Sequence, residues 1–210
     1  MSTAHNHQVY AELTPNPNSL KFVTDQILLP EGVAEYKSQQ EAADCPLAYQ
    51  LFDFSGIKSV FISSNFITVT KETDIDWYDI TNILREFIIV FLNSGDKIFY
   101  VYPQVKKAES KNTATVVPEA LYLKKPASSK EETGDVVEKI KSMLDEYVRP
   151  AVARDGGAID FKSFEDGIVT VILKGSCSGC PSSTLTLKAG IENLLKRLVP
   201  EVEEVVAEEQ

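Results

Sequence analysis

The sequence predicts an α+β fold made of two small mixed α/β domains joined by a flexible linker. Three observations support this prediction. Short runs of strand length and helical patterns occur in both halves of the 210-residue chain. The segment 104–130 between them contains two prolines and has no sustained hydrophobic period. The sign of the charge also changes along the chain, and it does so at the edges of this segment.

The charge divides the chain into three parts. Residues 1–103 carry 6 Lys and Arg against 13 Asp and Glu, residues 104–130 carry 6 Lys against 2 Glu, and residues 131–210 carry 9 Lys and Arg against 16 Asp and Glu. The composition of the basic middle part cannot bury enough apolar surface to order the chain. We therefore predict domains at 8–103 and 131–207, with a linker at 104–130.

The first domain is predicted to contain both helices and strands. Apolar patterns predict strands at 9–13, 20–24, 60–63, 66–70 and 97–102, and helices at 46–52 and 77–93. The segment Thr14-Pro15-Asn16-Pro17-Asn18 is a predicted turn between the first two strands. The longer helix has Asp76 as a predicted N-cap and Gly95 just past its end. No phosphate loop, nucleophile elbow or paired-carboxylate motif is found in this half.

The second domain has the predicted order α-β-β-α-β. A helical period runs over 135–148, and Asp155-Gly156-Gly157 is a predicted chain reversal. Alternating strands on either side of an Asp-Gly step at 166–167 predict a hairpin. A second helix is predicted at 181–199, with Pro181 at its first position, and a last edge strand is predicted around 202–206.

Cys177 and Cys180 lie in the loop between the second strand and the last helix of this domain. Two intervening residues allow both sulfur atoms to face one metal centre, and Gly175 and Gly179 allow the backbone to curl around them. A helix N-terminus also favours thiolate over thiol. The pattern therefore predicts a thiolate site at Cys177 and Cys180.

The number of ligands limits what this site can bind. A structural zinc site and a four-iron four-sulfur cluster each take four protein ligands. The domain has two cysteines, and no histidine follows position 7. Either a second copy of the chain supplies the other pair across a twofold axis, or the pair performs redox chemistry alone. The third cysteine, Cys45, has no assigned role.

Composition excludes several other classes of function. A pI near 4.8 and a net charge of -10 argue against a nucleic-acid partner, which needs a basic face. The longest apolar run, 87–92, is far shorter than the roughly 20 residues that cross a bilayer, so no membrane partner is expected. No signal or transit sequence is recognised at the start of the chain. An odd number of cysteines indicates a reducing compartment, and we expect a cytoplasmic protein.

Several segments resemble the NifU-like (Nfu) iron–sulfur proteins. The strings DGG at 155–157, FEDG at 164–167 and GSCSGCPSS at 175–183 are similar to the C-terminal domain of that family. The strings TPNPNSLKF at 14–22, PLA at 46–48 and FITVTK at 66–71 are similar to its N-terminal domain. The resemblance covers nearly the whole chain outside the linker.

This resemblance implies a scaffold or carrier and not an enzyme. Cys177 and Cys180 match the ligand pair of the family, which implies a labile [4Fe-4S] cluster shared between two subunits. The implied partners are the upstream cluster-assembly machinery, apo iron–sulfur proteins that accept the cluster, and a second copy of the chain when it is loaded. The resemblance also leads us to expect a bacterial member of the family, located in the cytoplasm.

Two alternatives remain open at this stage. A thioredoxin-like dithiol/disulfide protein also places C-x-x-C at a strand-to-helix junction, but there the approach is a βαβ unit and here it is a predicted hairpin. A zinc-stabilised interaction module would also be dimeric, with four cysteines around one metal ion.

Overall fold

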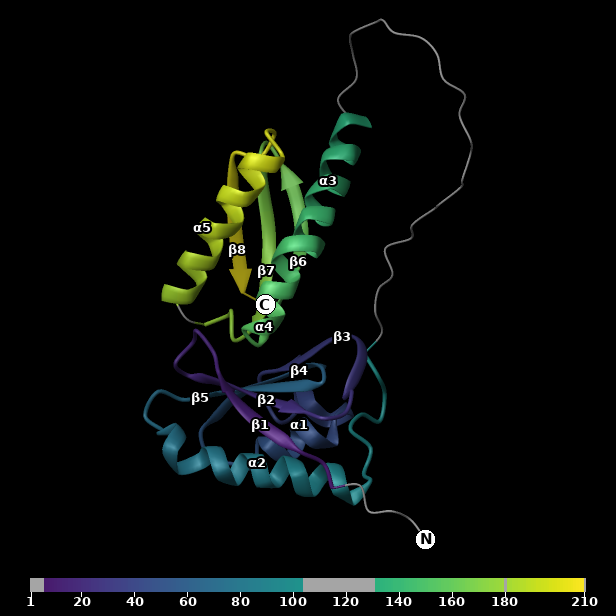
Figure 1. Cartoon of the computed structure of the whole chain (residues 1–210), viewed down its shortest axis with the longest axis vertical. Coiled ribbons are helices and arrows are strands. Elements are labelled where there is room, and N and C mark those ends of the chain that lie inside the picture. The colour runs from purple at the N-terminus through teal and green to yellow at the C-terminus, as the bar shows by residue number, and fades with distance from the viewer. Residues whose placement is uncertain (1–5, 104–130, 180, 210) are drawn as a thin grey trace, which may run out of the picture.

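The computed structural model describes residues 6–103, 131–179 and 181–209 of the chain. They form two domains in which helices pack on a β-sheet, one before and one after the predicted linker (Figure 1). The predicted α+β class is therefore confirmed. The linker at 104–130 lies outside the described residues. In the described part of the chain, no helix is both long and apolar enough to cross a membrane.

The N-terminal domain is built on a five-stranded antiparallel sheet with the strand order β1-β2-β5-β4-β3. Its strands are β1 (Val9–Leu13), β2 (Ser19–Thr24), β3 (Leu29–Tyr36), β4 (Ile57–Ser64) and β5 (Phe66–Lys71). The two hairpins that the sequence predicts, β1–β2 and β4–β5, are both present.

The two faces of this sheet have different neighbours, because successive side chains of a strand point to opposite faces. The inner face packs against α1 (Pro46–Leu51) and α2 (Trp77–Ser94) and forms the N-terminal core (Figure 1). The core residues that the central strands supply to this face are Leu20, Phe22, Val60, Ile62, Ile67 and Val69. The outer face is turned toward the C-terminal domain (Figure 1).

The ends of α2 are set by the two residues that the sequence indicates. The Asp76 side chain accepts a hydrogen bond of 2.9 Å from the backbone N–H of Tyr78, which satisfies one of the free donors of the first turn. Gly95 ends the helix with φ of 78°, in the left-handed region that favours glycine. Leu84 and Ile88 are fully buried on the face that contacts the sheet.

The predicted strand at 97–102 is wrong. The segment is irregular, and it is held by a hydrogen bond of 2.7 Å from the Tyr100 N–H to the carbonyl of Asp44. Phe99 is buried in the N-terminal core. Phe99 therefore anchors the segment without pairing with the sheet, while Tyr100, Val101 and Tyr102 are exposed.

Strand β3 is not predicted from the sequence. Pro30 and Gly32 interrupt the alternation that marks a strand, and Gly32 has φ of 82°. The pairing of β3 with β4 shifts register between Leu29 and Val33. An irregularity of this kind breaks the period on which the prediction depends.

The C-terminal domain follows the predicted order α-β-β-α-β, its first helical segment being divided into three parts. Its elements are α3 (Glu131–Met143), the wider π turn η2 (Leu144–Val148), α4 (Arg149–Arg154), β6 (Gly157–Glu165), β7 (Ile168–Gly175), α5 (Pro181–Leu198) and β8 (Glu204–Glu209). β7 lies in the centre of the sheet, antiparallel to β6 and parallel to β8.

The β6–β7 hairpin turns at the predicted Asp-Gly step. Asp166 and Gly167 both have positive φ, 49° and 80°, as expected for a tight hairpin turn. The core under this sheet includes the fully buried Val171, Leu173 and Leu195. At the other end of the hairpin, β7 leads directly into the loop that contains Cys177.

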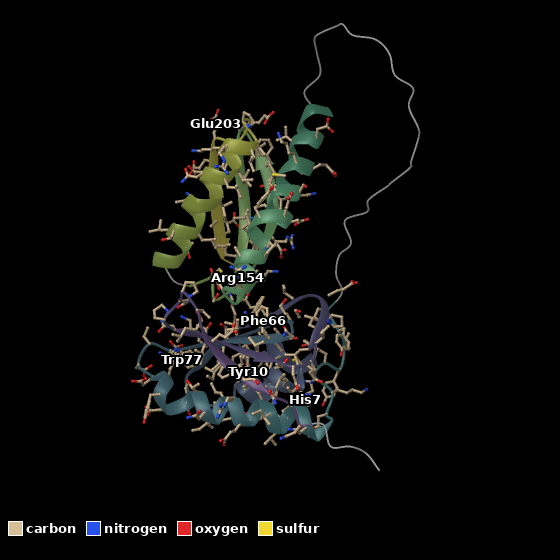
Figure 2. All side chains as sticks on the ribbon, viewed as in Figure 1. His7, Tyr10, Phe66, Trp77, Arg154 and Glu203 are labelled. Carbon is tan, nitrogen blue, oxygen red and sulfur yellow. The ribbon has the colours of Figure 1, made fainter. Side chains whose placement is uncertain are left out.

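That loop-bearing end of the C-terminal domain faces the outer face of the N-terminal sheet (Figure 1). Figure 2 shows Arg154 at this end, Phe66 on the sheet below it, and Glu203 at the opposite end of the domain. The two domains are in direct contact, since the Lys21 Nζ donates a hydrogen bond of 3.1 Å to the carbonyl of Arg154.

Candidate functional site

The loop that follows β7 contains Cys177 and is shaped by glycines. Gly175 and Gly179 have φ of 66° and 75°, in the region that other residues rarely adopt. The Ser178 N–H and hydroxyl both donate to the carbonyl of Gly175, at 3.1 and 3.0 Å. These bonds curl the backbone around Cys177, as the sequence predicts. Cys180, the other cysteine of the motif, lies outside the described residues.

Cys177 is buried, with 6% of its surface exposed. A side chain at Gly157, on the neighbouring strand β6, would lie 2.7 Å from its Sγ. The Ser176 hydroxyl lies 3.8 Å from the same sulfur atom, and the Thr184 hydroxyl donates to the carbonyl of Cys177 at 3.2 Å. The thiol therefore sits between the end of the hairpin and the beginning of α5.

Burial raises the pKa of Cys177 to about 11, and the hydrogen bond between Cys177 and Ser176 opposes this only in part. The negative charge of Asp155 raises the pKa further. Burial therefore opposes the thiolate that the sequence predicts at Cys177 in the cluster-free chain. The reason is that removal of the sulfur from water disfavours the charged form more than the nearby donors favour it.

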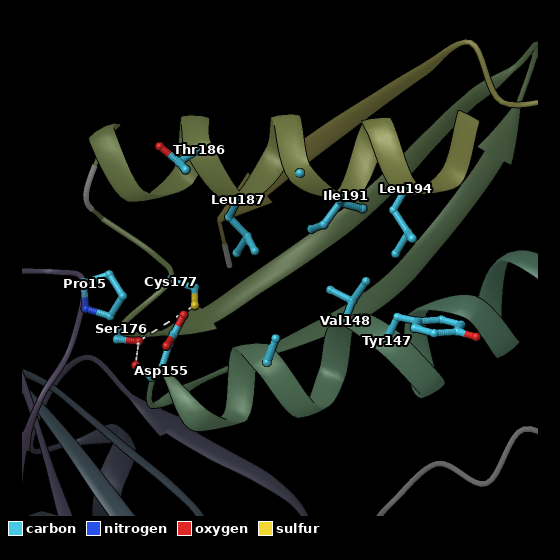
Figure 3. Close-up of a pocket in the computed structure, with 12 residues that line it drawn as sticks. Pro15, Tyr147, Val148, Asp155, Ser176, Cys177, Thr186, Leu187, Ile191 and Leu194 are labelled. Atoms are coloured by element: carbon cyan, nitrogen blue, oxygen red, sulfur yellow. Dashed lines mark hydrogen bonds between the residues drawn. The ribbon is translucent and has the colours of Figure 1, made fainter. Parts of the chain in front are cut away.

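An apolar pocket of about 580 Å³ adjoins the sulfur of Cys177. Figure 3 shows it between α5 and the η2–α4 segment, with Cys177, Ser176 and Asp155 at one end. Its walls are mostly aliphatic, and one lining residue comes from the N-terminal domain. The apolar lining residues are Pro15, Val148, Ala151, Leu187, Ile191 and Leu194. Cys177 therefore lies at the polar end, beside Ser176 and Asp155, of a pocket whose other walls are mostly aliphatic.

Asn16 is a site residue that the sequence reasoning misses. Its side-chain Nδ2 donates to the carbonyls of Ser176 and Ser178, at 3.2 and 3.3 Å, on either side of Cys177. Asn16 is 1% exposed, although it lies in the predicted turn between β1 and β2. The only sequence signal for Asn16 is its position between two prolines, a pattern that predicts a turn and not a contact with a distant loop.

Cys45 lies apart from this site. It is fully buried in the N-terminal core, whereas Cys177 belongs to the core of the C-terminal domain. Burial raises the pKa of Cys45 to about 12. The structure therefore does not bring Cys45 to Cys177. Among the residues that the structure describes, no three His, Cys, Asp or Glu side chains come together in a group able to hold a metal ion.

Comparison with known proteins identifies the family of both domains. The family described as "Scaffold protein Nfu/NifU N terminal" matches residues 9–95, and the NifU-like domain matches residues 140–206. A Homo sapiens protein named "NFU1 iron-sulfur cluster scaffold homolog, mitochondrial" is 41% identical over 193 residues, which are 91% of this chain and 68% of the relative. The chain belongs to the Nfu/NifU family. The predicted resemblance is thereby confirmed.

Further comparisons match this Nfu/NifU chain over different shares of its length. An Arabidopsis thaliana protein named "NifU-like protein 4, mitochondrial" is 35% identical over 202 residues, which are 95% of this chain and 65% of the relative. A solution structure of a NifU-like protein from Saccharomyces cerevisiae covers 47% of this chain and 89% of its own, with 24% identity and a TM-score of 0.43. The chain thus spans about two thirds of the length of these longer relatives.

The two matched segments of this Nfu/NifU chain lie within the predicted domain bounds. Residues 9–95 fall inside 8–103, and residues 140–206 fall inside 131–207. The bounds themselves stay a prediction, because family matches end at the last alignable residue and not at the edge of a domain. The candidate site lies in the NifU-like segment, while Pro15 and Asn16, which contact it, lie in the Nfu N-terminal segment.

Proposed function

We propose that this protein is an iron–sulfur cluster scaffold and carrier, which binds a labile [4Fe-4S] cluster and delivers it to apo-proteins. One observation carries the proposal above all others. Cys177 lies in a glycine-shaped loop at the end of a NifU-like domain, and the human relative of that domain architecture is named an iron–sulfur cluster scaffold. The cluster is cargo in this proposal, and the chain is not an enzyme.

The proposed ligands are Cys177 and Cys180. Thiolate sulfur is the usual protein ligand of iron–sulfur clusters, and one [4Fe-4S] cluster takes four of them. The chain has 3 cysteines, of which Cys45 is buried in the other domain. We therefore propose that two copies contribute Cys177 and Cys180 each, so that the cluster is shared between subunits.

The surroundings of Cys177 support a releasable cluster. The thiol lies in the loop that joins β7 to α5, at one end of its domain, and it adjoins a pocket of about 580 Å³. A cluster held between two copies, and not enclosed by one of them, also allows exchange with a third protein.

Anaerobic reconstitution with iron and sulfide tests the proposal. We expect broad visible absorption, about four irons and four sulfides per dimer, and a dimeric mass for the loaded protein. Incubation with an apo iron–sulfur protein should then move the absorption to the acceptor. A colourless product with about one zinc ion per dimer would instead favour the zinc-stabilised module.

The thioredoxin-like alternative is disfavoured by the topology of the site. Cys177 follows an antiparallel β6–β7 hairpin, whereas the thioredoxin motif is associated with a βαβ unit. An insulin-reduction assay separates the two functions directly. The carrier proposal expects no turnover, and steady reduction that depends on Cys177 would support the redox alternative.

The partners and location that we propose follow from this role. The partners are the machinery that supplies the cluster, the apo-proteins that accept it, and a second copy of the chain in the loaded state. The bacterial cytoplasm stays our predicted location, and cell fractionation with an antibody tests it. The word "mitochondrial" in the names of the relatives describes those proteins.

A further inference from the structure

The central strands of the N-terminal sheet are buried on both faces. Phe61, Thr68 and Lys21 are 1%, 1% and 8% exposed, yet none of them belongs to the N-terminal core on the inner face. A polar threonine and a lysine are seldom buried to this extent unless their polar atoms have partners. The outer face is therefore covered, and the end of the C-terminal domain is what faces it (Figures 1 and 2).

Four residues of this outer face form a straight row across the sheet, which we call the docking row. The register pairs Lys21 of β2 with Thr68 of β5, Thr68 with Phe61 of β4, and Phe61 with Glu35 of β3. Neighbours in such a row lie about 5 Å apart, so their side chains make one continuous strip. The residues at its two ends, Lys21 and Glu35, are charged.

Two residues of the docking row bind the turn that precedes β6. The Thr68 hydroxyl donates to the carbonyl of Gly156 at 2.7 Å. The Lys21 Nζ donates to the carbonyl of Arg154 at 3.1 Å. Both acceptors are backbone atoms beside the chain reversal that leads to Gly157, the residue packed against Cys177.

The other two residues bind the start of the cysteine loop. A carboxylate oxygen of Glu35 accepts a hydrogen bond of 3.0 Å from the N–H of Gly175. A side chain at Gly175 would lie 3.0 Å from the ring of Phe61, and one at Gly156 would lie 2.8 Å from the hydroxyl of Thr68. The docking row thus fits closely against backbone that carries no side chain.

Asn16 extends this contact around the thiol itself. Its amide donates to the carbonyls of Ser176 and Ser178, the two residues that flank Cys177. Together with the docking row it holds both ends of the loop and the turn beneath it. Five side chains from one domain thus contact backbone of two short segments of the other.

We propose that the docking row and Asn16 form an intramolecular docking surface for the cysteine loop in the cluster-free chain, and that this docking competes with the approach of a second copy. The coupling to a second copy rests on the proposed function. The occupant of the surface is a segment of the same chain, the turn at 154–157 and the loop at 175–178.

Competition follows from the position of the surface. A cluster shared by two copies brings a second loop next to Cys177, at the same end of the C-terminal domain that the N-terminal sheet covers (Figure 1). The N-terminal sheet and a second copy of the chain cannot occupy this end of the C-terminal domain at the same time. Weaker docking of the sheet should therefore strengthen binding of the shared cluster. By linkage, loading must weaken docking by the same factor and release the outer face of the sheet.

Alkylation of the apo-protein tests the docking without iron. Pulses of iodoacetamide followed by peptide mapping give the rate at Cys177 in the full chain. Thr68→Val and Asn16→Ala each remove side-chain hydrogen-bond donors, and we expect each to raise this rate about fivefold. The double variant should react faster still and should have a larger radius of gyration by small-angle X-ray scattering.

Two controls accompany these variants. Thr81→Val makes the same change in α2, where the hydroxyl donates to the carbonyl of Trp77, and it should leave the rate at Cys177 unchanged. Cys45, buried in the N-terminal core, is an internal standard whose rate should stay low in every folded variant. Equal Cys177 rates in wild type, Thr68→Val and Asn16→Ala would overturn the docking proposal.

Loading with limiting iron and sulfide tests the competition. We expect the double variant Asn16→Ala/Thr68→Val to bind more cluster than wild type under the same conditions. Equal or lower loading of that variant would overturn the coupling. If neither wild type nor any variant binds a cluster, but alkylation of Cys177 is still faster in the variants, then the proposed function and the competition are wrong and the docking is supported. If clusters bind normally while alkylation is unchanged, the docking fails alone.

Discussion

Gly157 and Cys177 lie so close together that no side chain fits between them. A methyl group at Gly157 would lie 2.7 Å from the Sγ of Cys177 and 2.6 Å from the carbonyl oxygen of Lys174. Both distances are shorter than any normal contact, and the carbonyl is backbone that cannot swing away. The thiol of Cys177 can therefore occupy its position only because residue 157 of β6 is a glycine.

We predict that Gly157→Ala destabilises the C-terminal domain. The added methyl group has to displace the end of β7 or the cysteine loop, and overpacking of this kind typically costs about 1–3 kcal/mol. Chemical denaturation followed by circular dichroism measures the loss. The variant should also react faster at Cys177, because its loop no longer packs on β6.

Gly190→Ala is the matched control for that substitution. Gly190 lies within α5, and nothing lies within 4 Å of an added methyl group. Alanine in place of a helical glycine stabilises by roughly 0.5–1 kcal/mol. The two variants should thus change the free energy of unfolding in opposite directions, and a loss of equal size in both would contradict the packing argument.

We predict that Cys177 and Cys180 are cluster ligands and that Cys45 is not. Cys177→Ser and Cys180→Ser should each reduce cluster-bound iron to background after anaerobic reconstitution, because two copies of either variant retain only half of the four thiolates. Cys45→Ser should bind the cluster as wild type does. If Cys45→Ser abolished binding while Cys177→Ser retained it, the ligand assignment would be wrong.

We predict that Cys45 is inert in the folded chain. Burial raises the pKa of its thiol to about 12, so almost no thiolate is present between pH 7 and pH 9. Alkylation followed by peptide mapping should show no modification of Cys45 in native protein and rapid modification in denaturant. Rapid reaction of the native protein at pH 8 would show that this core opens readily.

The same thiol should make stability fall at high pH. The pKa of Cys45 is raised from 9.0 in the ordinary thiol to about 12 in the folded chain, so the folded state keeps a proton that the unfolded state releases. Its contribution is complete below about pH 9 and decreases as pH rises toward 12. Cys45→Ala lacks this titration, so the free energy of unfolding should depend less steeply on pH above 9 than that of wild type.

Local signals predicted much of the fold because each depended on a few neighbouring residues. Asp76 and Gly95 marked both ends of α2, and the Asp-Gly step at 166–167 marked the β6–β7 turn. β3 was missed because Pro30 and Gly32 break its alternation. In these cases the prediction was correct where local chemistry decides the conformation, and it failed where pairing with a distant strand decides it.

The site was predictable only in part, for the same reason. The loop and its cysteines are contiguous in sequence, so spacing and glycines indicated them. Asn16 and Ser176, however, are 160 positions apart and meet only because the two domains dock. The raised pKa of Cys177 is likewise a consequence of burial, which residue spacing does not reveal.

The contact between Glu192 and Val205 leads to a last prediction, on acid sensitivity. One oxygen of the Glu192 carboxylate accepts from Lys196 at 2.7 Å, and the other accepts from the N–H of Val205 in the edge strand β8 at 3.1 Å. The hydrogen bond from Lys196 is the main reason that the pKa of Glu192 is lowered from 4.5. The ionised carboxylate therefore joins α5 to β8.

A carboxyl group with a lowered folded pKa stabilises the protein above its ordinary pKa, and this stabilisation is lost as pH falls through the folded value. Protection of the Val205 amide from hydrogen exchange should thus be greater in wild type than in Glu192→Gln at pH 6, and the difference should shrink as pH falls below 4.5, the ordinary pKa of the carboxyl group. The exposed Glu201, changed to glutamine, is the matched control and should behave as wild type. A difference between wild type and Glu192→Gln that stays constant from pH 6 to pH 3 would mean that shape, and not charge, makes Glu192 hold β8.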